Sequence, residues 1–272
     1  RMSDIALGEL ATVQDTKTQV MALRDGMREL RGASFQSQFF AAPLKRVTSL
    51  LHHELNTPLN GILGSMTVIQ DAMVARELDQ VDEFLSYVHT SSKRLNRAIQ
   101  KLLRFIDLSV RYEHPQSWPS SQSREVTLNT QALISQLSEL SERTDLEHRL
   151  RIHFETIRFP IDLTDAVFIM HELADNSLRH STPDSLVNIY ADTSRESFLE
   201  INFENEGSFP HSTIDKIAPF QQPNRASHEN QGLGLGLHLT KTILEANHGN
   251  LELSNLPNNT ARTRIIFDLS FT

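Results

Sequence analysis

Two neighbouring stretches of helical apolar spacing constrain the fold more than any other feature of the chain. The first has apolar residues at steps of three or four, at Val47, Leu51, Leu55, Leu59, Ile62, Met66, Ile69 and Met73. The second, after a short polar break at residues 75–79, has them at Val81, Leu85, Val88, Leu95, Ile99, Leu102 and Ile106. This pattern predicts two amphipathic helices joined as a hairpin, each with one buried stripe.

A two-helix hairpin is incomplete by itself, because two helices offer too little partner surface to bury both apolar stripes. A four-helix bundle made from two copies of the hairpin would bury them. The sequence therefore predicts a homodimer that forms through its helices.

The region before the hairpin, residues 1–43, carries a weaker periodicity. Val13, Val20 and Met27 stand seven residues apart, and Leu23 and Leu30 complete a short three-four pattern. Two heptads favour a coiled-coil linker. A single amphipathic helix that packs on its own domain is the alternative.

The pattern changes after residues 113–124, which combine two prolines, four serines and the only tryptophan, a composition typical of a linker between domains. Beyond it, short β-rich runs occur at 150–154, 186–190, 198–203, 251–253 and 263–269, with helical patterns at 130–142, 164–179 and 235–246. This order predicts an α/β sandwich, a mixed sheet with helices on one face. The expected parts are thus a linker helix (1–43), a helical hairpin (44–112), a linker (113–124) and an α/β domain (125–272).

The first helix of the hairpin carries a histidine that we expect to face solvent. At about 100° per residue, His53 points about 175° away from the apolar stripe, whereas His52 lies only about 75° from it and should pack on its flank. A neutral imidazole can accept a phosphoryl group if a base takes its other ring proton, and Glu54 can supply that base. The alternatives are an ordinary surface histidine or a zinc ligand, although adjacent residues on a helix cannot both face one metal.

A second chemical signal is the alternation of Gly232, Gly234 and Gly236, which holds three of the ten glycines of the chain. Glycines let backbone N–H groups approach phosphates closely, and the apolar run that follows predicts a helix whose N-terminus favours negative charge. The pattern suits a triphosphate. A tight turn without a ligand is the alternative.

The run H-E-L-N-T-P-L at residues 53–59 resembles the phospho-accepting box of sensor histidine kinases, H-E-L-R-T-P-L, and departs from it only at Asn56. The resemblance implies that His53 is the phosphoacceptor and that Glu54 is the base that orients it. It also implies that Thr57, one helical turn further on, orients the water that dephosphorylates the aspartyl phosphate of a partner protein.

The glycine run and residues 172–181 resemble the G2 and N boxes of histidine kinases and of the wider gyrase-like ATPase superfamily. The resemblance implies that Asn176 coordinates Mg²⁺ and that Arg179 and His180 contact the phosphates of ATP. Glu172 departs from the asparagine common in the kinases. Because a glutamate at this position activates water in gyrase-like ATPases, we expect Glu172 to be a metal-shell or water-positioning residue. Without the resemblance, the same segment is an amphipathic helix with a polar face.

The adenine-binding G1 box is the weakest match. Residues 205–210 have an asparagine, Asn205, in place of the usual aspartate, and after Gly207 they lack the second glycine. The amide oxygen of Asn205 can still accept a hydrogen bond from the adenine amino group. Arg225 lies between the boxes in the expected lid, where it could reach the γ-phosphate; a solvated loop charge is the alternative.

The resemblance covers about residues 44–270 and implies an ATP- and Mg²⁺-dependent kinase. It would phosphorylate itself on His53 and pass the phosphoryl group to an aspartate in the receiver domain of a response regulator. A net charge of -8 argues against nucleic acid as the main partner. The absence of cysteine favours the cytoplasm, and the absence of a long apolar run predicts no direct membrane contact in this fragment. The fragment could also be the cytoplasmic part of a membrane-bound sensor.

Three other functions stay open from the sequence. The atypical G1 box permits a nucleotide-impaired dimeric phosphotransfer or phosphatase module, which would take no label from ATP. Glu172 permits a non-kinase gyrase-like ATPase, whose hydrolysis would not need His53. The helices permit a non-enzymatic dimeric scaffold, which would bind no adenine nucleotide.

Overall fold

The computed structural model describes residues 44–75, 81–113, 125–140, 146–192, 197–215, 217–220 and 232–271. The chain divides into two compact units between residues 107 and 108. Three predictions lie wholly or almost wholly outside the described residues: the coiled coil within residues 1–43, the linker at 113–124 and the lid position of Arg225. They stay predictions.

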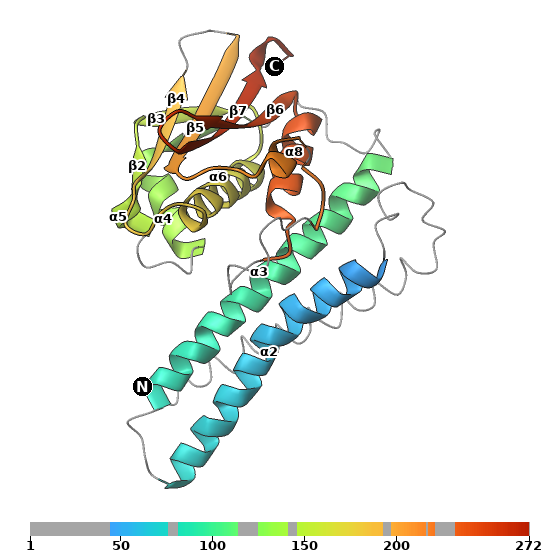
Figure 1. The fold of residues 1–272 in the computed structure, drawn as a ribbon, viewed down its shortest axis with the longest axis vertical. Helices are drawn as coiled ribbons and strands as arrows, with labels where there is room; N and C mark the ends of the chain where they lie inside the picture. The colour runs from blue at the N-terminus through green and yellow to red at the C-terminus, as the bar shows by residue number, and fades with distance from the viewer. Residues whose placement is uncertain are drawn as a thin grey trace. The chain divides into compact units, whose positions relative to one another are not determined.

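The N-terminal unit is a helical hairpin, as predicted. Helix α2 (Leu44–Ala75) lies beside α3 (Val81–Glu113), and α2 continues through Pro58 (Figure 1). The two helices share one apolar core, made of the buried residues Ile62, Val88, Leu95 and Ile99 with Leu55, Leu59, Met66 and Ile69 packed against them. A side chain at Gly61 would meet the Ser91 hydroxyl at 2.8 Å, so this glycine lets the helices approach closely.

The C-terminal unit contains a five-stranded mixed sheet, again as predicted. In spatial order its strands are β2 (Leu150–Ile152), β4 (Val187–Asp192), β5 (Phe198–Glu206), β7 (Thr260–Asp268) and β6 (Gly249–Leu256). The β2–β4 pair is parallel, and the other pairs are antiparallel. Their buried side chains alternate along each strand, which gives the sheet one apolar face.

Helices cover that apolar face. Helix α6 (Leu163–Arg179) contacts β4, β5, α4 (Thr130–Leu140) and α8 (Gly236–Ala246), while α8 also packs on β6 (Figure 1). Asp162 caps the start of α6, since its carboxylate accepts a hydrogen bond from the Asp165 N–H at 2.8 Å. The arrangement makes α6 the central helix of the unit, in contact with both other long helices and with the sheet.

Four short elements were missed from the sequence. A two-stranded antiparallel sheet joins β1 (Val126–Asn129) to β3 (Thr156–Phe159), and α5 (Leu146–Arg149) and α7 (His211–Asp215) are single turns. Each has only four or five residues. Such lengths are too short for a periodic pattern to stand out. A 3-10 turn, η4 (Leu269–Phe271), follows β7.

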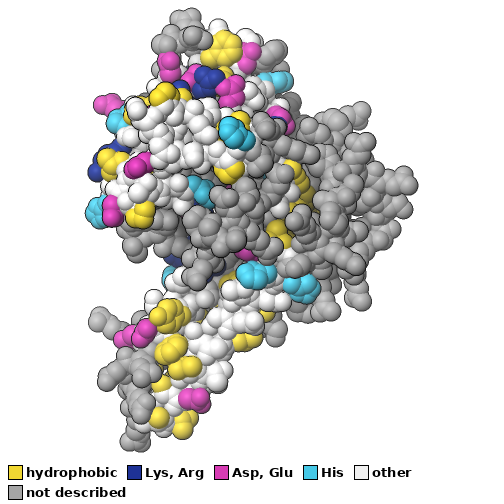
Figure 2. All heavy atoms as spheres, in the orientation of Figure 1, with side chains coloured by type: hydrophobic (Ala, Val, Ile, Leu, Met, Phe, Trp, Pro, Cys, Tyr) yellow, Lys and Arg dark blue, Asp and Glu magenta, His cyan; other side chains and the backbone are white. Residues whose placement is uncertain are grey.

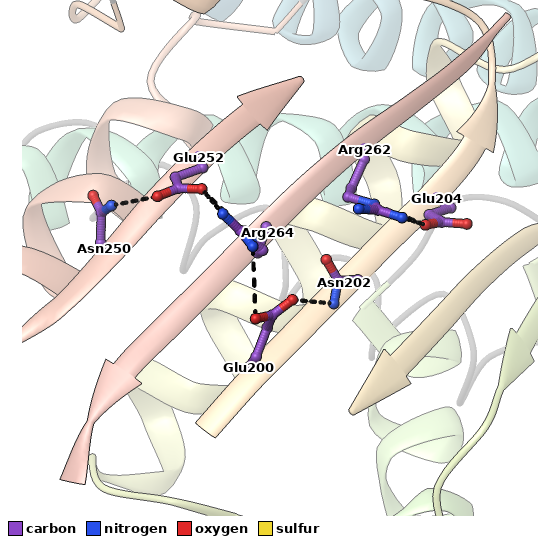
Figure 3. A network of polar contacts seen from close by, with 7 residues as sticks. All are labelled: Glu200, Asn202, Glu204, Asn250, Glu252, Arg262 and Arg264. Carbon is purple, nitrogen blue, oxygen red and sulfur yellow. Dashed lines mark hydrogen bonds and ion pairs between the residues drawn. The ribbon is translucent and has the colours of Figure 1, made fainter. Parts of the chain in front are cut away.

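The opposite face of the sheet is polar and is held by ion pairs across the strands (Figure 3). Arg262 on β7 bonds Glu204 on β5 at 2.6 Å. Arg264 pairs with Glu252 on β6 and approaches Glu200 on β5 at 3.6 Å. Opposite charges on neighbouring strands stabilise an antiparallel sheet that leaves one face to solvent. None of the described helices is long and apolar enough to cross a membrane.

Replacing Ile99 by alanine should destabilise the hairpin by about 3 kcal/mol, because its fully buried side chain would leave a cavity between α2 and α3. Chemical denaturation of the full chain, followed by circular dichroism, measures the loss. Alanine at the neighbouring exposed Gln100 is the control and should leave the unfolding midpoint within error. Equal midpoints for both variants would contradict the assigned core.

The stability of the C-terminal unit should fall as the pH is lowered from about 6.5 to 4. Burial, and to a smaller extent the positive charge of nearby Lys241, lowers the pKa of His238 on α8 from 6.5 to about 4. Between these values the unfolded chain binds a proton that the folded chain rejects, so acid favours unfolding. Chemical denaturation across this pH range should show that the free energy of unfolding falls less in His238→Gln than in the wild type. The exposed His211→Gln is the control and should follow the wild type.

Candidate functional site

The first candidate site is the exposed histidine on α2. The side chain of His53 is 62% exposed, as predicted, and its Nδ1 lies 3.6 Å from Oε1 of Glu54, which is only 18% exposed. An imidazole that carries its proton on Nδ1 beside a carboxylate presents the lone pair on Nε2. The pair therefore favours Nε2 as the nucleophilic nitrogen of an exposed ring.

The neighbours of this pair are also open to solvent. Thr57 is exposed one turn after His53. The prediction that His52 packs on the flank of the stripe is wrong for the single chain, because His52 is exposed and lies 3.4 Å from the Asn56 amide. A single hairpin leaves the flank of the α2 stripe at His52 uncovered, although helical periodicity assigned this flank to the core.

The second candidate site is built on α6, which carries Glu172, Asn176 and Arg179 and is capped by His180, the four polar residues predicted from residues 172–181. Glu172 is only 3% exposed, and Asn176 is half-buried one turn later. Arg179 and His180 end the helix, where the His180 N–H donates to the Asn176 carbonyl at 3.0 Å. Polar side chains so deep in a helix need partners or a ligand to offset the loss of water.

The glycine loop meets α6 at the start of α8. Gly234 has a φ of 66°, a conformation that glycine adopts without strain, and Gly236 begins the helix. A side chain at Gly236 would overlap a carboxylate oxygen of Glu172 and would lie 3.8 Å from the Asn176 amide nitrogen. The structure therefore brings Glu172, Asn176 and Gly236 together. Among the residues that the structure describes, no atom crowds the position of a side chain at Gly232, so their packing does not explain its identity.

A second cluster forms at the C-terminal end of α6, next to His180. Asn205 is buried at the end of β5, and its amide nitrogen donates to the Glu206 carbonyl at 3.1 Å. Gly207 has a φ of 142° and donates its N–H to the Asn259 carbonyl at 2.7 Å. A side chain at Gly207 would not fit, because its Cβ would lie 2.8 Å from the carbonyl oxygen of His180. Helix α6 thus joins the G1-like segment and the glycine loop.

Two supporting residues were missed from the sequence. Asp175 is buried and accepts a hydrogen bond from Arg179 at 2.6 Å, so part of the guanidinium is already engaged within α6. Arg149 is also buried and donates to the carbonyls of Thr182 and Ser185 at 3.0 and 2.9 Å, which holds the loop after α6. Asp175 lay within the recognised segment, but the Arg149 contacts join residues more than thirty positions apart and leave no local signal.

The glycine-loop cluster suits Mg²⁺ better than a metal held by protein alone. Within the described ranges, no group of three or more His, Cys, Asp or Glu residues is arranged to hold a metal ion. Mg²⁺ usually takes one or two protein oxygens and completes its shell with phosphate oxygens and water. The carboxylate of Glu172 and the amide of Asn176 offer such oxygens beside Gly236, so the residues present fit the ion.

Comparisons with known proteins match both units. The family model for the His Kinase A (phospho-acceptor) domain matches residues 44–108, and that for the histidine kinase-, DNA gyrase B- and HSP90-like ATPase matches residues 161–272. The sensor protein SrrB of Staphylococcus aureus, in strains NCTC 8325 / PS 47 and COL, is 26% identical over 213 residues. The match covers 75% of this chain and 34% of SrrB, so the chain spans about a third of the length of these relatives.

Two solved structures share the fold. The Acinetobacter baumannii histidine kinase AdeS superposes with a TM-score of 0.52 at 18% identity, covering 80% of this chain and 98% of that one. Full-length ShkA in complex with AMPPNP gives a TM-score of 0.50 at 18% identity and covers 82% of this chain and 45% of that one. The two domain matches, in the order phospho-acceptor then ATPase, assign the chain to the histidine kinases as a catalytic core, and these structures agree with its fold.

Proposed function

We propose that the protein is an ATP-dependent histidine kinase that phosphorylates itself on His53 and passes the phosphoryl group to an aspartate in the receiver domain of a response regulator. The observation that carries the proposal is the pairing of an exposed His53 with Glu54 at 3.6 Å, within the part of the chain that matches the phospho-acceptor family. Residues 44–112 would form the acceptor domain and residues 125–272 the ATP-binding domain.

In the proposed reaction, the Nε2 lone pair of His53 attacks the γ-phosphorus of ATP. The nitrogen–phosphorus bond forms as the bond from phosphorus to the β,γ-bridging oxygen breaks, and ADP leaves with the electron pair. Glu54 stabilises the positive charge that develops on the ring, because its carboxylate faces Nδ1. An aspartate carboxylate of the receiver domain then takes the phosphoryl group from Nε2 and returns His53 to its neutral form. Thr57 would orient water when the receiver is dephosphorylated.

The nucleotide would lie along α6, because the two clusters of polar residues and glycines lie at successive positions of that helix. Mg²⁺, held by Asn176 with Glu172 nearby, would neutralise phosphate charge and polarise the γ-phosphoryl group. Asn205 would accept from the adenine amino group, since its amide nitrogen already donates within the protein. The remaining assigned contacts to the nucleotide are Arg179, His180, Gly207, Arg225, Gly232, Gly234 and Gly236. ShkA, which shares the fold, is itself in complex with AMPPNP.

The kinase would act as a homodimer through its helices. Helices α2 and α3 carry six of the ten large apolar side chains that are exposed among the described residues: Leu63, Met73, Val74, Tyr87, Leu103 and Val110. Figure 2 shows apolar side chains along the visible side of the hairpin. A second hairpin would cover such a surface and complete a four-helix bundle.

Incubation with ATP labelled in its terminal phosphate should label the wild-type protein, and His53→Gln should reduce the label to background. Glutamine removes the nucleophilic nitrogen but keeps a polar side chain on the exposed face of α2. His52→Gln is the matched control, because it removes the adjacent exposed imidazole and should keep the label. Label that persists in His53→Gln would reject the acceptor. An unlabelled wild type that still binds ATP would favour the phosphotransfer or phosphatase alternative.

A charge on the exposed apolar line of α2 should separate the dimer. Leu63 and Val74 are 56% and 87% exposed. Because they stand eleven residues apart, they point within about 20° of each other on a helix. Leu63→Glu should therefore shift the species seen by size-exclusion chromatography with light scattering from about 62 kDa to about 31 kDa, twice and once the chain mass. Gln100→Glu on α3 adds the same charge at an exposed polar position and should stay dimeric. A wild type of single-chain mass would contradict the proposed bundle.

A further inference from the structure

Arg149, the last residue of α5, holds the loop that follows α6. Only 6% of this residue is exposed, so its guanidinium needs hydrogen-bond partners within the protein. Its Nε donates to the Ser185 carbonyl at 2.9 Å, and its Nη2 donates to the Thr182 carbonyl at 3.0 Å and to the Ser181 hydroxyl. One side chain thereby fixes both ends of the turn at residues 181–185.

The turn is joined closely to the C-terminal end of α6. The Ser181 hydroxyl donates to the Leu178 carbonyl at 2.9 Å, and the Thr182 carbonyl also accepts from the Ser185 N–H at 3.1 Å. A cation is favoured here, because the C-terminus of a helix carries partial negative charge. A planar guanidinium can reach several carbonyls at once, whereas the compact ammonium of a lysine cannot reproduce this fork. Arg149 therefore fixes the end of α6 together with the turn.

The other side of the turn faces the adenine end of the proposed site. Val187 begins β4 and pairs with β2, which Arg149 immediately precedes, on one side and with Asn205 of β5 on the other. His180, directly before the turn, packs against Gly207, whose Cβ would lie 2.8 Å from the His180 carbonyl oxygen. A shift of the turn would therefore move His180 relative to the G1-like segment.

We infer that Arg149 is a positioning residue for the nucleotide, because it holds the turn at residues 181–185 and so keeps His180 against Gly207. That contact sets the position of Asn205, the proposed acceptor for the adenine amino group. The inference rests on the proposed function, since it assumes that ATP binds along α6. Loss of the Arg149 fork should weaken recognition of the base, while the phosphate end of the site at the glycine loop stays in place.

Isothermal titration of the full chain tests the inference by comparing AMPPNP with its guanine counterpart GMPPNP, with Mg²⁺ throughout. Guanine carries a carbonyl oxygen where adenine carries its amino group, so it cannot donate to Asn205 there. Arg149→Lys should weaken AMPPNP binding by about 10-fold and change GMPPNP binding by less than about two-fold, because only adenine loses a contact. Arg151→Lys is the matched control, since Arg151 is exposed and bonds to the carbonyls of neighbouring His148 and Leu150, and it should keep both affinities.

Autophosphorylation kinetics separate positioning from a general loss of structure. Arg149→Lys should raise the KM for ATP about 10-fold and leave the labelling rate at saturating ATP within about two-fold, because ATP then fills the site despite weaker recognition of its base. A damaged fold would lower the saturating rate as well. Ser181→Ala removes one acceptor of the Arg149 fork but keeps the cation, so it should raise the KM by a smaller factor. It decides the question if Arg149→Lys does not fold.

The outcomes separate this inference from the proposed function. If both variants keep the wild-type KM and base preference, the inference is wrong and the kinase proposal stands. An equal loss of affinity for AMPPNP and GMPPNP, or a lower saturating rate with an unchanged KM, would also overturn it, because Arg149 would then not act at the adenine end. If the wild type itself binds no AMPPNP, the nucleotide site is wrong and both proposals fail.

Discussion

The C-terminal unit depends on the burial of α6 between the sheet and its neighbouring helices. Ile169, Met170 and Leu173 on this helix are almost completely buried, and α6 contacts β4, β5, α4 and α8. Burial of these side chains stabilises the layer and also decides where the polar face of the same helix must lie. The positions of the proposed nucleotide-site residues on α6 follow from this packing.

The same packing explains why buried polar groups are tolerated here. Glu172 and Asp175 stand on a helix surrounded by protein, and the structure accommodates them in different ways. Asp175 is paired with Arg179, whereas the carboxylate of Glu172 lies 3.6 Å from Nδ1 of His171 and against Gly236 at the start of α8. A carboxylate beside a helix N-terminus is stabilised by the helix dipole. Because Gly236 has no side chain, the carboxylate of Glu172 can lie at the start of α8. The glycine therefore affects both the shape and the electrostatics of the site.

The hairpin shows the complementary situation, in which burial is incomplete in one chain. Its core is a narrow seam around Leu95 and Ile99, and apolar side chains such as Leu63 and Val74 stay outside it. His53 lies on the side opposite to the seam, so packing leaves its ring accessible while Glu54 faces Nδ1. An acceptor histidine needs this combination of a rigid backbone and an exposed nitrogen.

The sequence alone determined the hairpin, the exposure of His53, the mixed sheet and the order of the boxes, because each of these depends on local periodicity or on a contiguous motif. It was wrong about His52, since periodicity does not tell how much of a stripe one chain can cover. It missed β1, β3, α5 and α7, which are too short to show a period.

Only the tertiary structure decided which distant residues meet. The contact of Glu172 with Gly236, the approach of Gly207 to His180, and the anchoring of the loop at 181–185 by Arg149 each join segments that are far apart in the chain. These contacts follow from how α6 and α8 pack on the sheet. A linear pattern contains the residue types that a site needs, but the close packing of the layers sets the distances between them.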